Sequence, residues 1–371
     1  MKIYDVIIIG GGLAGLTSAI DLSSSGFEVL LIEKDEYPKH KVCGEYVSNE
    51  VLPYFNRLGI DINQTKADQI NRLTLSNRNG ETVNVGLPLG GFGMSRYALD
   101  HLLYEKAKSN GVQFKFETVT GVEFENEQFC ITTNQQNYYS ELAIGSFGKR
   151  STLDKKLGRY FINKKTPWIG IKAHYQSDDF PNGEVQLHNF EGGYCGLSKT
   201  ETGAVNFCYL AHYDSFKKEG SVENFNQHIL TKNPKLKSFL KNSEMLFDKH
   251  LAISQVSFQN KNAVENHMLM AGDSAGLIHP LCGNGMAMAI HSAKLLSEEI
   301  KKYKTFKSRN QLEENYTAIW EQTFRKRLIF GSAFQKILLQ PKLTNLGMSL
   351  VSKSPFLIKK MIQQTHGKPI S

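Results

Sequence analysis

Apolar and polar positions follow two different periods along the chain, and these periods predict an ordered series of strands and helices. Residues 3–10, IYDVIIIG, are a nearly continuous apolar run that ends in glycine, which is typical of a buried parallel strand. Residues 13–26 carry apolar side chains at helical spacing, and residues 27–34, FEVLLIEK, predict a second strand. Together these segments predict a βαβ unit.

A hairpin and a helix are expected next. Two strand-like segments within residues 70–87 meet around Asn79-Gly80, a dipeptide that favours a tight hairpin turn. Residues 95–111 then show helical spacing, with Ser95 as the expected N-cap and a glycine just past the end.

Strands dominate the middle of the chain and helices its last part. Residues 112–144 predict several strands, and residues 167–211 alternate in the manner of an antiparallel sheet. Residues 267–273, HMLMAGD, predict another buried strand. Residues 285–303 predict a strongly amphipathic helix, and helical patterns continue beyond it.

The composition is that of a folded, soluble protein. The chain has 371 residues, of which 40% are hydrophobic and 22% charged, enough for two or more domains. Its five cysteines are an odd number, lie far apart and form no CxxC pair, which suits a reducing compartment. No histidine or cysteine cluster has metal-ligand spacing, and no stretch approaches the ~20 apolar residues of a membrane span. We therefore expect a cytoplasmic protein without a metal.

The net charge of +8 is unevenly distributed. Residues 322–371 contain nine Lys or Arg and no acidic residue, so the first 321 residues sum to 8 − 9 = −1. A nearly neutral body argues against a nucleic-acid partner. Three interpretations of the basic, partly apolar end stay open: peripheral contact with the inner face of a membrane, a cap on another domain, and an oligomer contact.

The first strand leads into a glycine-rich turn with the spacing GxGxxG. Gly10 allows a tight turn, Gly12 lets the backbone approach a pyrophosphate, and Gly15 lets the helix pack on the strand. Glu33, at the end of the second strand, can accept a ribose hydroxyl and would repel a 2′-phosphate. The motif therefore predicts the adenosine part of FAD or NAD rather than NADP.

Residues 270–285, MAGDSAGLIHPLCGNG, admit two interpretations. GDSAG fits the GxSxG pattern of a hydrolase nucleophile elbow, but there a helix follows the serine directly. Here Pro280 and two more glycines come before the next helix can begin. In a two-stretch FAD site, a late strand ends in Gly-Asp and the aspartate accepts a ribityl hydroxyl. The sequence favours this second interpretation, with Asp273 as the binding residue.

With these motifs, the chain resembles the superfamily of the para-hydroxybenzoate hydroxylase-like monooxygenases, the geranylgeranyl reductases and the flavin-dependent halogenases. The resemblance spans roughly residues 1–300. It implies that Asp273 binds the ribityl chain, that Gly283 and Gly285 approach the flavin ring, and that Arg96 contacts FAD. The segment KVCGEYVS is similar to the Lys-x-Cys-Gly segment of the geranylgeranyl reductases, which implies that Cys43 lies near the flavin.

The sequence departs from this superfamily in three places. Residues 145–148 read Gly-Ser-Phe-Gly where the family usually has Gly-Ala-Asp-Gly, so Phe147 replaces an acid linked to pyridine-nucleotide use. The paired-tryptophan motif of the halogenases is absent, since the chain has only Trp168 and Trp320. The Tyr-x-Trp-x-Phe-Pro motif of the reductases is reduced to YCGLS at residues 194–198.

Three residues are candidates for proton transfer. Cys43 is either a proton donor or a small packed residue, and His279 is either a general acid or an ordinary loop histidine. Glu45 is either part of a proton relay or a solvated carboxylate. The expected cofactor-binding residues are Gly10, Gly12, Leu13, Ala14, Gly15, Glu33, Lys34, Arg96, Gly272, Asp273, Gly283, Asn284 and Gly285.

Two enzymatic functions follow from the resemblance, and one non-enzymatic function stays beside them. A monooxygenase would hydroxylate a lipophilic aromatic or alkene, and a geranylgeranyl reductase-like enzyme would reduce an isoprenoid double bond. Both use FAD with NADH, NADPH or another electron donor. The third option is a flavin-binding redox partner. We favour the monooxygenase, because the substrate motif of the reductases is degraded while the cofactor motifs are intact.

The expected fold is α/β, with a Rossmann-type FAD-binding domain, an antiparallel-sheet substrate domain and a C-terminal helical region. The expected FAD-binding domain is discontinuous and comprises residues 1–66, 94–160 and 261–303. The expected substrate domain comprises residues 67–93 and 161–260, and the helical region comprises residues 304–371.

Overall fold

The computed structural model describes residues 2–259, 261–277, 283–338 and 367–370. Within residues 332–338 it describes the backbone alone. His279 and most of the basic C-terminal end lie outside the described residues, so the expectations for them stay predictions. Among the described residues, no helix combines the length and the apolar character that a membrane crossing requires.

The first sheet is built around parallel strands in the order β16-β17-β9-β1-β2-β6. All neighbours in this order are parallel except β16 and β17, and β7 and β8 extend the sheet from β9 in antiparallel fashion. The strands are β1 (Ile3–Ile9), β2 (Val29–Glu33), β6 (Gln113–Phe116), β7 (Val119–Glu125), β8 (Gln128–Thr133), β9 (Asn137–Gly145), β16 (Val264–Glu265) and β17 (Met268–Met270).

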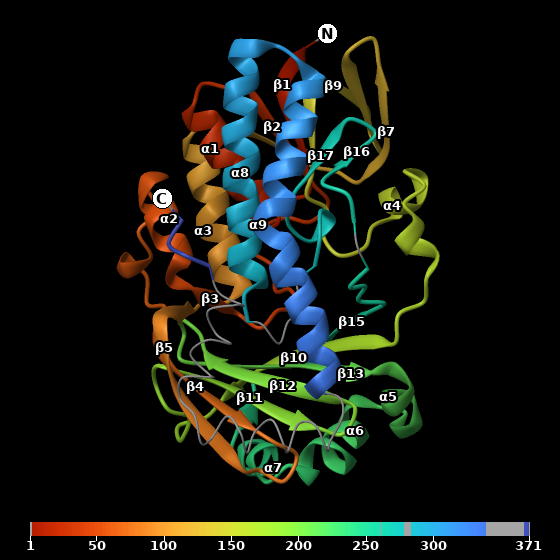
Figure 1. The fold of residues 1–371 in the computed structure, drawn as a ribbon. Coiled ribbons are helices and arrows are strands. Elements are labelled where there is room, and N and C mark those ends of the chain that lie inside the picture. The colour runs from red at the N-terminus through yellow and green to blue at the C-terminus, as the bar shows by residue number, and fades with distance from the viewer. Residues whose placement is uncertain (1, 260, 278–282, 339–366, 371) are drawn as a thin grey trace.

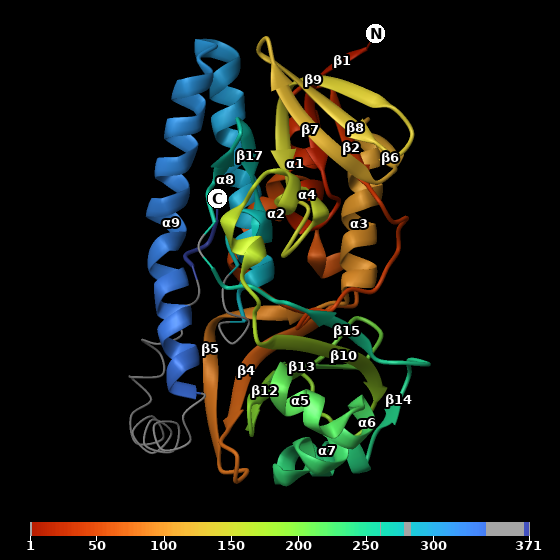
Figure 2. The same ribbon diagram turned by 90° about the vertical axis from the view of Figure 1, so that its right-hand side faces the viewer.

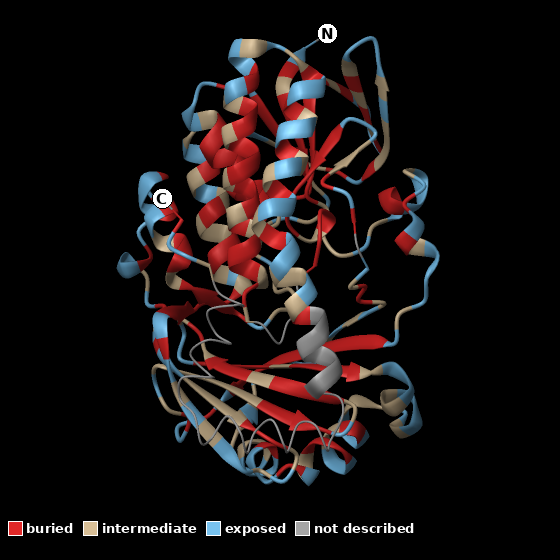
Figure 3. Ribbon diagram, viewed as in Figure 1, coloured by how far each residue is buried: buried red, intermediate tan, exposed pale blue. Residues whose placement is uncertain are grey.

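Helices cover this sheet and bury its apolar strands (Figure 1, Figure 3). The helix α1 (Leu13–Ser24) packs between α3 (Arg96–Ser109) and α8 (Gly285–Phe306). The last long helix, α9 (Arg309–Leu338), runs back along α8 toward the second sheet (Figure 1). The strands β1 and β2 are almost fully buried, as expected for continuous apolar runs between two layers.

The second sheet is mostly antiparallel, in the order β14-β10-β13-β12-β11-β4-β5-β3, with β15 paired to β10. Among the strands that the structure describes in this sheet, only β11 and β4 are parallel neighbours. The strands are β3 (Tyr46–Ser48), β4 (Asp68–Ser76), β5 (Thr82–Gly93), β10 (Trp168–Gln176), β11 (Glu184–Phe190), β12 (Gly193–Lys199), β13 (Val205–His212), β14 (Glu244–Met245) and β15 (Leu251–Ser254).

The two faces of the second sheet have different neighbours (Figure 2). One face packs on α5 (Tyr213–Glu219), α6 (Val222–His228) and α7 (Pro234–Lys241), and together they form an apolar cluster of their own. The other face is turned toward the edge of the first sheet where β1, β2, β9 and β17 end (Figures 1 and 2). The loops that follow these strands therefore lie between the two sheets.

Short elements complete the described chain. They are the helices α2 (Leu52–Arg57) and α4 (Thr152–Lys156) and the 3₁₀ turns η1 (Asn49–Val51), η2 (Ile62–Gln64), η3 (Tyr160–Asn163), η4 (Leu230–Lys232) and η5 (Gly272–Ser274).

The α/β architecture expected from the sequence is confirmed, and so is its local detail. Gly80 has a φ of +82° in the turn between β4 and β5, as the hairpin signal predicts. Ser95 caps α3, since its Oγ accepts the Ala98 N–H at 3.0 Å. The expected domain boundaries stay a prediction. The strand β3 lies within residues 1–66, which the sequence assigns to the FAD-binding domain, but it pairs with β5 in the second sheet.

Candidate functional site

The glycine-rich turn after β1 has a shape that side chains would disrupt. Gly10 has a φ of +101°, and a Cβ there would lie 2.6 Å from the carbonyl oxygen of Ser146. A Cβ on Gly15 would lie 2.1 Å from the carbonyl oxygen of Gly10. Both contacts are with backbone, which cannot move aside cheaply. The two glycines therefore hold β1, β9 and α1 in close contact, as the motif predicts.

The same turn leaves the start of α1 open to a ligand. Gly12 is the N-cap of α1, and no side chain caps this end. A Cβ on Gly12 would meet no described atom nearer than Arg96 Nη2 at 3.9 Å, so its surroundings are roomy. Free N–H groups and the helix dipole, with a guanidinium alongside, are what a pyrophosphate requires. Leu13 and Ala14 form the buried first turn that positions these groups.

Glu33 lies beside this turn at the end of β2. Its Oε2 accepts the Gly11 N–H at 2.6 Å, and its Oε1 accepts the Lys34 N–H at 3.1 Å. The Lys34 side chain itself is exposed. Glu33 thus has the position that the ribose interpretation requires.

The Gly272-Asp273 segment lies across the start of the same helix. Gly272 has a φ of +60°, and a Cβ there would lie 3.0 Å from Ala14 Cβ. Its N–H donates to Ser292 Oγ of α8 at 2.8 Å. The turn that carries Asp273 is therefore held between α1 and α8, at the carboxyl edge of the first sheet. Crevices at this edge are the usual ligand sites of doubly wound α/β folds.

Ser274 has a structural role, which rules out the hydrolase interpretation. Its side chain is fully buried, and its Oγ accepts the Gly148 N–H at 2.9 Å and lies 3.3 Å from the Gly148 carbonyl oxygen. A nucleophile needs an exposed hydroxyl and a base, whereas this hydroxyl joins two loops.

The start of α8 forms another side of the site. Gly283 has a φ of +61°, Asn284 is the N-cap, and Gly285 begins the helix. The Asn284 Nδ2 lies 3.3 Å from a carboxylate oxygen of Glu50, which fixes this helix end against the segment after β3.

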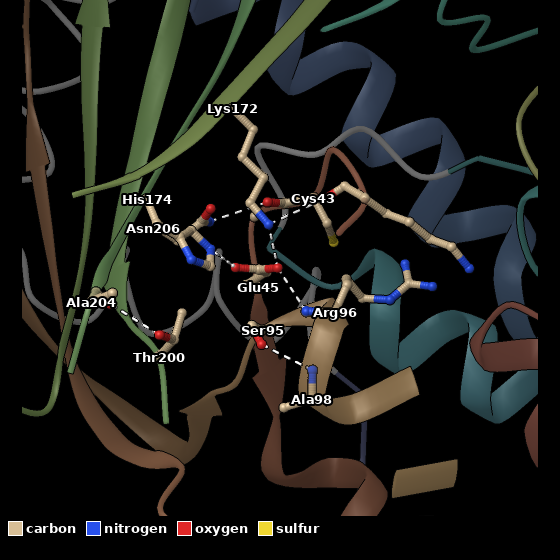
Figure 4. A network of polar contacts seen from close by, with 12 residues as sticks. Cys43, Glu45, Ser95, Arg96, Ala98, Lys172, His174, Thr200, Ala204 and Asn206 are labelled. Carbon is tan, nitrogen blue, oxygen red and sulfur yellow. Dashed lines mark hydrogen bonds and ion pairs between the residues drawn. The ribbon is translucent and has the colours of Figure 1, made fainter. Parts of the chain in front are cut away.

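Arg96 lies at the start of α3 and joins the turn to the Cys43 loop. Its guanidinium forms a bidentate ion pair with Asp100, at 2.6 and 2.7 Å, and Lys41 Nζ contacts the same carboxylate at 2.9 Å. The Cys43 side chain lies beside Arg96 (Figure 4). Burial would raise the pKa of Asp100, but the charges of Arg96 and Lys41 outweigh it and the pKa lies below its usual value.

Glu45 is fully buried, so it is not a solvated carboxylate. Its Oε1 accepts the Arg96 N–H at 2.7 Å and pairs with Lys172 Nζ, while its Oε2 lies 2.7 Å from His174 Nε2 (Figure 4). Burial would raise the pKa of Glu45, but the hydrogen bond from His174 and the charge of Lys172 hold it below its usual value. Whether Glu45 takes part in proton transfer stays a prediction.

The side chains of His40, Glu45 and His174 have a geometry that could hold a metal ion. One donor atom each of His40, Glu45 and His174 lie within 4.8 Å of one another. Lys172 Nζ pairs with one oxygen of Glu45 and His174 with the other, so the carboxylate is already compensated by a cation. Glu45, Lys172 and His174 therefore form a hydrogen-bonded cluster, and His40 lies beside it in ring contact with His174, with no hydrogen-bond partner among the described residues for its own Nδ1.

An apolar area adjoins this polar cluster on the same face of the second sheet. Its buried members come from β10, β12, β13 and the loops that follow β15 and β17, and they are Trp168, Tyr194, Leu210, Val256 and Leu277. Leu277 follows Asp273 by four residues and ties this apolar area to the expected flavin loop. Trp168 and Tyr194 are both buried within this apolar area.

Two residues of the site were missed by sequence reasoning. They are Lys172 and His174, which carry no motif that would single them out in the sequence. Both lie on the same face of β10 at a spacing of two, and the whole strand apart from its last residue is buried. One sequence signal could have indicated the site. Lys172 lies within a strand that is otherwise apolar enough to be covered on both faces.

Known proteins give the site its context. A family model described as "FAD binding domain" matches residues 3–326. Digeranylgeranylglycerophospholipid reductase of Methanococcus vannielii is 24% identical over 352 residues, 90% of this chain and 86% of the relative.

Solved structures show the same fold over most of the chain. The flavin-dependent brominase Bmp2 has a TM-score of 0.80 at 18% identity, covering 98% of this chain and 93% of the brominase. PqsL of Pseudomonas aeruginosa, a probable FAD-dependent monooxygenase, has a TM-score of 0.74 at 14% identity, covering 92% of this chain and 98% of PqsL. The glycine turn, the open start of α1 and the match of residues 3–326 lead to one conclusion: the chain belongs to the FAD binding domain family.

Proposed function

We propose that this FAD-dependent oxidoreductase is a monooxygenase that hydroxylates a lipophilic aromatic or alkene. The observation that carries the proposal is the apolar area around Trp168, Tyr194 and Leu210, which faces the loops of the cofactor site. Apolar pockets with few polar groups bind apolar ligands, and they also keep water away from reactive species.

The residues of the chain fit FAD, which supplies two-electron and oxygen chemistry when bound. Gly12 and the start of α1 would hold the pyrophosphate, Glu33 the ribose and Asp273 the ribityl chain. The start of α8 at Gly285 would direct its positive end at the ring and favour negative charge there. Arg96 would add a second positive charge beside the phosphates. The apolar residues would orient the substrate and exclude water.

Reduction of an isoprenoid double bond is the second candidate. It is favoured by the position of Cys43 beside Arg96, where a thiol could donate a proton, and by the name of the Methanococcus relative. The degraded aromatic motif at residues 194–198 argues against it. Either reaction would draw electrons from NADH, NADPH or another donor.

Labelled oxygen separates the two candidates. The purified holoprotein is incubated with NADH or NADPH, a lipid extract of aromatic and isoprenoid compounds, and ¹⁸O₂, and the products are analysed by mass spectrometry. Hydroxylation predicts products that gain one ¹⁸O atom and depend on oxygen. Products that gain two hydrogens without oxygen, also under anaerobic conditions, would replace the proposal with double-bond reduction.

A non-enzymatic redox partner predicts a third result. The flavin would be reduced and reoxidised, but no compound in the extract would change under any donor. The ratio of product formed to donor consumed therefore tests the enzymatic proposal directly.

A further inference from the structure

The pair formed by Lys172 and Glu45 is costly to bury. Both side chains are fully buried, and His174 beside them is 5% exposed. Removing a carboxylate and an ammonium from water costs several kcal/mol each, and an apolar pair of similar volume is often as stable. Stability alone is therefore a weak reason for this cluster. Buried titratable groups with specific charge partners are instead frequent at functional sites.

One hydrogen bond and one close approach connect the cluster to the cofactor turn. The Arg96 guanidinium is the nearest described group to the open side of Gly12, at 3.9 Å from a Cβ placed there. The backbone N–H of Arg96 donates to Glu45 Oε1 at 2.7 Å. Asn206 Nδ2 donates to the Cys43 carbonyl oxygen at 3.1 Å, and Lys172 Nζ donates to the Lys41 carbonyl oxygen at 3.2 Å. Side chains of the second sheet thus hold the loop before Glu45 in place (Figure 4).

His40 connects the other side of the cluster to the surface. Its ring centroid lies 5.2 Å from that of His174, edge to face, and 4.7 Å from that of Tyr97. His40 is partly exposed and Tyr97 is exposed, whereas His174 is buried. Burial lowers the pKa of His40, and the charges of Lys172 and His174 lower it further. The neutral ring of His40 is therefore favoured, and this ring lies between the solvent and His174.

We propose that Glu45, Lys172 and His174 form a proton-donating cluster for the reaction at the flavin, which His40 reloads from the solvent. The proposal rests on the proposed function, because both candidate reactions consume protons. Hydroxylation turns substrate, O₂, NADH and H⁺ into hydroxylated product, NAD⁺ and water. Double-bond reduction adds one hydride and one proton.

A turnover then moves one proton and restores the charges. Lys172 or His174 gives a proton to the group that is reduced at the flavin, while the Glu45 carboxylate stays between them as the acceptor of their hydrogen bonds. His40 passes a proton from the solvent to the cluster, and the original charge returns. The other charged or titratable groups that face the cluster are Lys41, Cys43, Arg96, Asp100, Glu201 and Cys208.

The test uses a reaction that needs no added substrate. Photoreduced holoprotein is mixed with oxygen between pH 6 and 9, and reoxidation of the flavin, with hydrogen peroxide as the other product, is followed by absorbance. In this reaction the anionic reduced flavin gives two electrons and one proton to O₂, and the second proton of hydrogen peroxide has to come from the protein or the solvent. Its outcome does not depend on whether the enzyme hydroxylates or reduces its own substrate.

The variants are Lys172→Met, which removes the ammonium but keeps an unbranched side chain only one atom shorter, and His174→Gln. We expect both to reoxidise on the order of 10²-fold more slowly than the wild type and with an altered pH profile. The FAD dissociation constant should stay within about 3-fold of the wild type. His188→Gln is the matched control, since His188 is a buried strand histidine that bonds Ser76 and Gln186 instead. It should reoxidise normally.

His40→Ala provides a second test that does not disturb the buried cluster. Its reoxidation should also be slower, and added imidazole should restore the rate because it carries protons to the vacated site. Wild-type rates in Lys172→Met and His174→Gln at every pH would overturn the proposal. A loss of FAD affinity proportional to the loss of rate would overturn it as well, because the cluster would then only position the loop.

Discussion

Individual residues of the cofactor site carry separable roles, and Asp273 is the most direct to test. Its turn is held between α1 and α8 by Gly272, at the edge of the first sheet where the parallel strands end. Asp273→Ala should weaken FAD binding by about 1–3 kcal/mol, because a buried ribityl hydroxyl would lose its partner. Fluorescence titration of apoprotein with FAD measures this. The exposed Asp179→Ala serves as control, and equal affinities in both variants would remove Asp273 from the site.

Cys43 is expected to govern turnover rather than cofactor binding. Cys43→Ser should keep the flavin spectrum and lose rate, typically ~10²–10⁴-fold if the thiol is a general acid. His279→Ala carries the same expectation from the sequence alone. Steady-state rates and the bound FAD per chain are measured together. Full activity in both variants would leave these residues with packing roles only.

His188 predicts how stability responds to acid. Burial, with a smaller contribution from Lys235, lowers its pKa to about 4 in the folded protein, against 6.5 for the free side chain. Folding favours the neutral ring. The contribution of His188 to the free energy of unfolding is therefore complete above pH 6.5 and is lost as the pH falls toward 4. The cost at pH 4 is about 3 kcal/mol.

Urea unfolding of His188→Gln and wild type at pH 7 and pH 4.5 measures this effect. The variant should lose less stability on acidification than the wild type. The exposed His228→Gln should behave as the wild type does. An equal loss in wild type and His188→Gln would contradict the assignment.

Single elements were predictable where one local signal sets them. The glycine spacing, Glu33 and the Ser95 cap place β1, α1, β2 and α3 correctly, because each depends on a backbone requirement or a hydrogen bond within a few residues. The role of β10 was not predictable in the same way. Its alternation of apolar residues with Lys172 and His174 indicates a sheet, but not what covers the second face. That face meets Glu45, which lies 127 and 129 residues away in sequence.

The end of the chain is a second element that the sequence did not predict. The Ile370 N–H donates to the Glu50 carbonyl oxygen at 2.7 Å, and the Gly367 N–H donates to the Glu50 carboxylate. Arg327 of α9 contacts the same carboxylate at 3.4 Å. The Ile370 side chain is buried in the main core. Residues 367–370 therefore act as a clasp over Glu50, whose carboxylate also holds Asn284 at the start of α8.

The clasp should support the cofactor site as well as the core. Ile370→Ala should cost about 2–4 kcal/mol of stability, through lost burial and a cavity, and weaken FAD binding measurably. Lys368→Ala, an exposed residue of the same segment, is the matched control and should change neither. Thermal unfolding of apoprotein and FAD titration separate the two effects. An Ile370→Ala protein with wild-type stability would show that residues 367–370 do not stabilise the fold.

At the scale of the whole molecule, the site lies between two sheets that contribute different things. The first sheet supplies the glycine turn, Glu33 and the Asp273 loop, and the second supplies an apolar area and the buried Lys172 and His174. The fold class and the cofactor follow from sequence because they rest on the first sheet. The substrate and the proton path rest on contacts between the sheets, which no local pattern encodes.

The cofactor itself is the central claim, and its identification requires no substrate. Purified protein is denatured by heat, the supernatant is separated by liquid chromatography, and any released flavin is identified by mass and quantified against the chain. The account predicts a yellow protein that releases close to one FAD per chain without covalent attachment. Release of FMN, or of no flavin from a protein that was saturated with FAD and desalted, would contradict it.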